Sequence, residues 1–175
     1  MGSLSSFVPE DQDFLASVFY KIGVWISHID DDGDCTADAE EEKVLMSVLE
    51  MLSKKHKAEP LIAQMTAEAA RQTGNHQRWA ENASDTAIPC AVKAAKMLKS
   101  QMSNEDFHAY KSASAEVARA VATAFREGDA VDQSGGEKVR VFLLKILSKD
   151  VHEEQNISPA EDSALTELHQ ALEQV

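Results

Sequence analysis

The chain has 175 residues, and its 17 Lys and Arg against 30 Asp and Glu give a formal net charge of −13. This charge argues against nucleic acid and anionic membrane surfaces as partners, because both bind proteins largely through Lys and Arg. At this length, 43% hydrophobic and 27% charged residues indicate one folded globular domain and exclude a disordered chain.

Apolar residues recur at helical spacing almost from the start of the chain. Residues 1–8 are expected to be a flexible N-terminus, and residues 9–175 a single all-helical domain. Pro9 suits the first turn of a helix over 9–29. The apolar stripe of that helix comprises Leu15, Val18, Ile22, Trp25, Ile26 and Ile29.

Two further helices are predicted before the middle of the chain. The first begins after Thr36, whose hydroxyl is a good N-cap, and runs to about Lys54. The second opens at Pro60 and ends near Gly74, a residue typical of helix ends.

Residues 76–101 are helical in pattern but contain a proline. We predict a break at Ser84–Asp85, with Asp85 capping a helix that holds Pro89 in its first turn. Trp79, before the break, is interpreted as a core-edge residue or an interface anchor.

The remaining elements are also predicted to be helical. Ser103 to Asp106 resembles a capping box and opens a helix that ends at Gly128. A loop at 129–136 precedes a helix over Val139–Leu147. Ser158 to Glu161 is a full capping box that starts the last helix. The prediction is therefore an all-α domain of about seven helices.

The negative charge is concentrated in one segment of the chain. Residues 1–42 hold eleven acids and one base, and the densest stretch, 30–42, holds eight acids and no base. Residues 43–111 have a net charge of +3, and residues 112–175 a net charge of −6. The first two predicted helices therefore meet at a strongly acidic junction.

Carboxylates at alternate loop positions beside a glycine are the ligands that a hard divalent cation requires. Three of the predicted ligands come from the loop and two from the following helix, where i, i+3 spacing places them on one face. The expected metal ligands are Asp30, Asp32, Asp34, Asp38 and Glu41, and the expected ion is Ca²⁺ or Mg²⁺.

Two alternatives to this cation site remain open. The segment is not a regular EF-hand, because counting from Asp30 puts Cys35 at position six instead of glycine. The acids also have a simple structural explanation: they solvate a turn and complement the positive end of a helix. Asp30-Asp31-x-x-Asp34 matches the spelling of a Mg²⁺-diphosphate motif, which keeps a remote Mg²⁺-dependent enzyme among the alternatives.

Other chemistry has weak support in the sequence. We identify no catalytic residue and no organic-cofactor site, since Ser/His/Asp sets, P-loops and GxGxxG are missing from the sequence. His28 is interpreted as a partner for the C-terminal end of its helix. Only Cys35 and Cys90 are present, which favours a reduced, cytoplasmic setting. Apolar runs long enough for a transmembrane segment are missing too.

The junction resembles the TerB-like family, named for the tellurite-resistance protein TerB. The matching residues are Asp32-Gly33-Asp34-Cys35-Thr36, after a helix that ends Trp25-Ile26-Ser27-His28-Ile29. Asn156 to Glu161 is similar to the return of the motif in the second half, a weak pseudo-twofold repeat. Two positions depart from the family pattern: Ala39 replaces an acid, and Glu154-Gln155 replaces Asp-Gly.

The resemblance implies a cation-binding adaptor in metal or oxidant stress, and we do not expect an enzyme. The first hypothesis is a cytoplasmic domain that binds a divalent cation at the acidic junction. The alternative is a metal-free interaction module whose acidic surface attracts a basic protein or a second copy of the chain, forming a homodimer.

Overall fold

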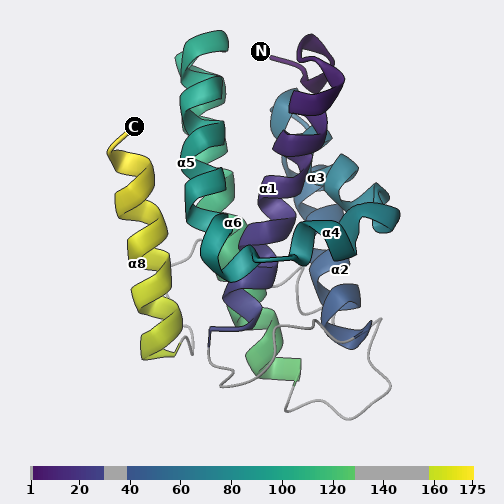
Figure 1. Cartoon of the computed structure of the whole chain (residues 1–175), viewed down its shortest axis with the longest axis vertical. Coiled ribbons are helices and arrows are strands. Elements are labelled where there is room, and N and C mark those ends of the chain that lie inside the picture. The colour runs from purple at the N-terminus through teal and green to yellow at the C-terminus, as the bar shows by residue number, and fades with distance from the viewer. Residues whose placement is uncertain (1, 30–38, 129–157) are drawn as a thin grey trace.

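The computed structural model describes residues 2–29, 39–128 and 158–175, without the side chains of 39–41 and 125–128 (Figure 1). Within these ranges the chain forms seven α-helices and two short 3-10 helices, and no strand. The all-α, single-domain prediction is thereby confirmed. The predicted Thr36 cap, the loop at 129–136 and the helix at 139–147 lie outside the described residues.

The helix bounds agree closely with the apolar spacing of the sequence. The α-helices are α1 Pro9–Ser27, α2 Ala39–Lys55, α3 Pro60–Arg71, α4 His76–Ala80, α5 Ala83–Gln101, α6 Asn104–Gly128 and α8 Pro159–Glu173. The 3-10 helices are η1 Leu4–Ser6 and η2 Thr73–Asn75. None of the helices described is long and apolar enough to cross a membrane.

Helix α1 is the central helix of the bundle. It packs against α2, α3, α4, α5 and α6. The sequence predicted a single apolar stripe, but the six consecutive residues from Leu15 to Tyr20 are all buried. A helix surrounded by other helices buries its whole circumference, so even Ser17 and Gly23 lie inside.

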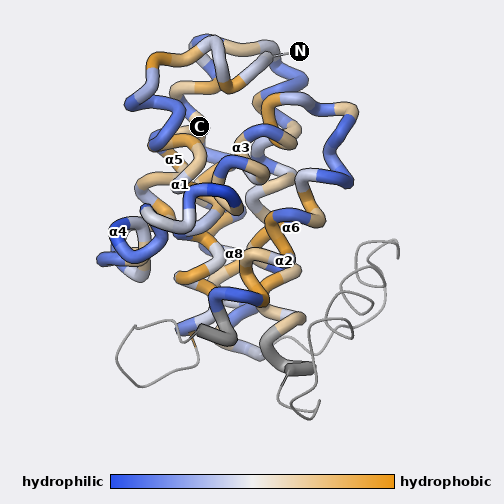
Figure 2. Tube along the Cα trace, turned by 90° about the vertical axis from the view of Figure 1, so that its right-hand side faces the viewer, coloured by the Kyte–Doolittle hydropathy of each residue, from blue (hydrophilic) through white to orange (hydrophobic). Residues whose placement is uncertain are grey.

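Residues far apart in the sequence close the bundle around α1. The Tyr110 hydroxyl of α6 donates to the Ala91 carbonyl of α5 over 3.0 Å, which fixes these two helices together. Helix α8 lies beside α5 and also packs against α6, burying Leu168 and Leu172 (Figure 1). Hydrophobic positions gather inside the bundle, whereas short α4 is largely hydrophilic (Figure 2).

Two helix starts follow directly from local sequence. Pro9 occupies the first turn of α1, as expected. At the start of α8, Ser158 Oγ accepts from the Glu161 N–H over 3.0 Å, and the Glu161 carboxylate accepts from the Ser158 N–H over 2.7 Å. The predicted capping box is thus confirmed, and both of its residues are buried.

The break between α4 and α5 falls earlier than predicted. Asn82 adopts a left-handed conformation with φ of 55°, so the chain turns there and α5 already begins at Ala83. Asp85 is therefore a first-turn residue and not the cap, and Pro89 lies inside the helix. Pro89 is exposed, so water can reach the carbonyl that its missing N–H leaves unpaired.

The N-terminal residues were expected to be flexible, but residues 2–8 make specific contacts. Leu4 and Phe7 are buried in the core. The Gly2 N–H donates to Asp106 Oδ2 over 2.9 Å, and the Leu4 N–H donates to Gln64 Oε1 over 2.8 Å. Apolar side chains with core positions offset the entropy of ordering this segment.

Candidate functional site

Most of the predicted cation site lies outside the described residues. This applies to Asp30, Asp32, Asp34 and Asp38, whose ligand geometry stays a prediction. Glu41 belongs to the first turn of α2, without a described side chain. The structure does describe the two ends of the acidic segment, which set where it leaves α1 and where it joins α2.

The end of α1 is closed by a buried histidine. His28 Nδ1 lies 2.8 Å from the Val24 carbonyl oxygen, one helical turn earlier, and Ser27 Oγ donates to the same oxygen over 2.9 Å. A carbonyl oxygen only accepts, so Nδ1 carries the hydrogen. This agrees with the interpretation of His28 as a partner of the helix end.

The start of α2 is held by the last of the eight acids. Glu42 Oε1 lies 2.7 Å from Nδ1 of buried His76, whose Nε2 donates to the Ala69 carbonyl over 2.8 Å. The ring of His76 stacks on Tyr20 of α1 with centroids 4.2 Å apart. Burial, with the nearby Glu42 carboxylate, raises the pKa of Tyr20, which keeps its hydroxyl neutral.

The sequence alone did not reveal this role of Glu42. Its helix spacing was consistent with a solvated acid near the positive end of α2. The partner, His76, is 34 residues later and comes from α4. Trp79, on the same short helix, is 3% exposed, so it is a core residue, and its indole N–H has no acceptor in the described part of the chain.

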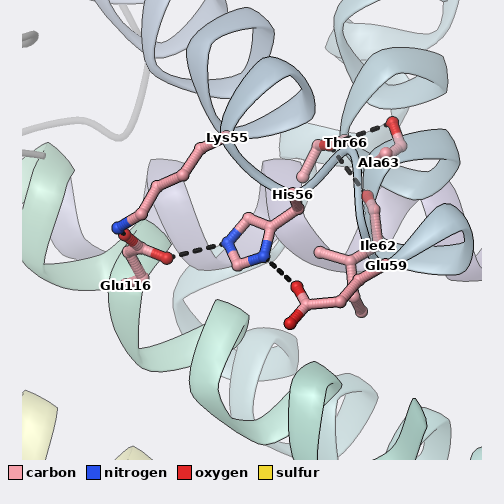
Figure 3. A network of polar contacts seen from close by, with 7 residues as sticks. All are labelled: Lys55, His56, Glu59, Ile62, Ala63, Thr66 and Glu116. Atoms are coloured by element: carbon pink, nitrogen blue, oxygen red, sulfur yellow. Dashed lines mark hydrogen bonds and ion pairs between the residues drawn. The ribbon is translucent and has the colours of Figure 1, made fainter.

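A second histidine is held between two carboxylates (Figure 3). His56, just after α2, has Nε2 2.8 Å from Glu116 Oε2 on α6, and its Nδ1 contacts the Glu59 carboxylate. Lys55 forms an ion pair with the same Glu116. The His56 and Glu116 side chains are 10% and 19% exposed, so the network is mostly shielded from water.

These contacts determine the protonation of the network. The hydrogen bond to Glu116, supported by the one to Glu59, raises the pKa of His56 against the opposing effect of burial. Burial favours neutral Glu116, but hydrogen bonds from His56 and Lys55 outweigh it and lower the pKa of that carboxyl. A ring that donates from both nitrogens has no lone pair for a metal or a substrate proton. His56 therefore joins the end of α2 to α6 through these carboxylate contacts.

Within 2–29, 39–128 and 158–175, no group of three or more His, Cys, Asp or Glu is arranged to hold a metal ion. The chain matches no model of a known protein family, and it has no match among curated proteins or among solved structures.

Proposed function

We propose that the chain is a cytoplasmic, non-enzymatic adaptor domain that binds a divalent cation at its acidic junction. The ligands are Asp30, Asp32, Asp34 and Asp38, with Glu41 assisting. The observation that carries the proposal is the run of eight acids without a base at 30–42, which extends from beyond the end of α1 into the first turn of α2. Carboxylates this dense repel one another, and a bound Ca²⁺ or Mg²⁺ relieves the repulsion.

The anchored ends of the acidic segment support this proposal. His28 closes α1 through the Val24 carbonyl, and Glu42 ties the first turn of α2 to His76. Glu42 is committed to this contact, so the ligand set is drawn from the acids before it. Both flanking helices are held by the core, so the two ends of the acidic segment are already positioned. This lowers the entropic cost of bringing its carboxylates together around a cation.

The proposed biological role is in metal or oxidant stress. It rests on the TerB-like resemblance of Asp32-Gly33-Asp34-Cys35-Thr36. In this role a cation stabilises the acidic junction, and a protein partner or a second copy of the chain binds to the surface of the junction.

Thermal melts with Ca²⁺, Mg²⁺, Mn²⁺ or EDTA test the cation site. An ion at a hundred times its Kd stabilises the fold by about 2.7 kcal/mol, which raises Tm by roughly 5–10 °C at this chain length. The Asp32→Asn/Asp34→Asn variant should lose this shift. The Glu50→Gln/Glu167→Gln variant removes the same charge from exposed positions on α2 and α8 and should keep it.

Two results would overturn the cation site: no shift with any ion, or equal shifts in the two double variants. The metal-free alternative predicts a different behaviour. A basic protein partner would bind with an affinity that falls steeply with salt and does not change with EDTA.

A further inference from the structure

A groove of about 500 Å³ lies between α6 and α8, with Lys55 of α2 at its edge. This volume is within the range of small-molecule sites. The α6 residues that line it recur along one face of the helix, from His108 to Ala120. These end residues are twelve positions apart, so the groove follows α6 for roughly 18 Å.

The groove has an apolar floor. Leu168 and Leu172, one turn apart on α8, face Ala115 and Ala120 of α6. Leu168 and Leu172 are 1% and 2% exposed, so they are core side chains whose edges line the groove and whose positions are set by packing. A hydrocarbon chain laid on this floor removes mainly its own apolar surface from water, and the floor does not have to be ordered first.

The rim of the groove is basic, although the whole chain is strongly acidic. Three cationic side chains line it, Lys55, Lys111 and Arg119, against two carboxylates. Both carboxylates already have partners: Lys55 pairs with Glu116, and Lys111 Nζ lies 2.5 Å from Glu173 Oε1. The groove therefore keeps one excess positive charge before its two histidines are counted.

That excess charge belongs to Arg119. Its guanidinium forms no ion pair or hydrogen bond among the residues that the structure describes, and the side chain is half-buried. A guanidinium presents parallel N–H donors that match both oxygens of a carboxylate. An unpaired guanidinium beside an apolar floor is a complementary surface for an anion that carries a hydrocarbon body.

We propose that this groove binds a small amphiphilic carboxylate, with its carboxylate on Arg119 and its hydrocarbon chain along Leu168 and Leu172. The site differs from the acidic junction in location and in the sign of its charge. Loss of one site would therefore leave the other unaffected. EDTA in the experiment below removes any contribution from divalent cations.

NMR titration of the full chain with sodium octanoate tests the site. Saturable shifts are expected for amides of α6 and α8 that flank the groove. Arg119→Gln should weaken octanoate at least tenfold, whereas Arg71→Gln, an equal charge change at an exposed position on α3, should leave it unchanged. Hexanoate should bind about fivefold more weakly than octanoate. It is two methylenes shorter, and the floor covers only one side of the hydrocarbon chain, so each methylene contributes about half of its full burial free energy.

Binding of uncharged 1-octanol distinguishes the contribution of the guanidinium from that of the apolar floor. Arg119→Gln should not change octanol binding if the substitution acts only through the carboxylate. His169→Glu, on the exposed rim, should weaken octanoate at least threefold and spare octanol, and it provides a second test should Arg119→Gln perturb folding. The proposal is overturned by no saturable shift at millimolar octanoate, by shifts away from the groove, or by equal losses in Arg119→Gln and Arg71→Gln.

Discussion

His56 and Glu116 are 60 residues apart in the sequence, yet Nε2 of the imidazole lies 2.8 Å from Oε2 of the carboxylate. The pair joins the end of α2 to the middle of α6, and Lys55 adds a second cation to the same carboxylate. Because α2 follows the acidic junction directly, this contact holds the far end of the helix on which the proposed cation site depends.

The first prediction concerns pH. The pKa of His56 is raised above its ordinary 6.5, so its contribution to stability is complete below that pH and is lost as pH rises through the folded-state value. The pKa of Glu116 is lowered below its ordinary 4.5, so its contribution is present above that pH and is lost as pH falls. The network should therefore stabilise the folded state most between pH 4.5 and pH 6.5.

Urea unfolding of His56→Gln at pH 6 and pH 9 measures this effect. At pH 6 the variant should be less stable than the parent by about 1.5–3 kcal/mol, the range for hydrogen bonds to charged groups. At pH 9 the difference in unfolding free energy between variant and parent should be smaller, because His56 of the parent has lost its charge. Replacement of exposed His169 by Gln should stay within about 0.5 kcal/mol at both pH values. A His56→Gln deficit that is equal at pH 6 and pH 9 would contradict the prediction.

The second prediction concerns the close approach of α1 and α2 at Gly23. A Cβ atom at this position would overlap Leu45 Cδ1 and lie 3.2 Å from Leu45 Cδ2. We expect Gly23→Ala to lower the free energy of unfolding by about 1–3 kcal/mol, although alanine favours helices by about 1 kcal/mol.

Gly74→Ala is the matched control, because a Cβ there has no heavy atom within 4 Å. Adding Leu45→Ala to Gly23→Ala should cost less than the sum of the two single changes, since each relieves the other. Additive costs in denaturant unfolding would show that the two residues do not interact as described.

The third prediction concerns the capping box of α8. Ser158→Ala removes the acceptor for the Glu161 N–H and should cost about 1 kcal/mol of stability. Ser163→Ala, an exposed change within the same helix, should be neutral. Hydrogen exchange should show faster opening of α8 in Ser158→Ala; unchanged α8 protection would be evidence against a stabilising role for the cap.

Local sequence was sufficient for most helix bounds. Pro9, Pro60 and the Ser158–Glu161 pair act within one turn, so their chemistry could be read without knowing the fold. The break at Asn82 was misplaced by about two residues, because an asparagine in the left-handed region leaves little trace in an apolar pattern.

The candidate site was less accessible to sequence reasoning. The concentration of acids at 30–42 is a property of the chain alone, and it predicts the cation ligands that the described residues do not test. The same pattern could not distinguish Glu42 from its neighbours. Its partner His76 comes from another helix, and only packing around Tyr20 brings the two together.

The sequence by itself determined the all-α class, the helix starts and the strongly acidic junction, because periodicity, capping and charge density are local properties. Only the tertiary structure decided that α1 is buried all round, that His56 bridges to Glu116, and that Arg119 faces an apolar floor from α8. These features arise where separate helices pack together, and the pattern of one helix does not specify its neighbour.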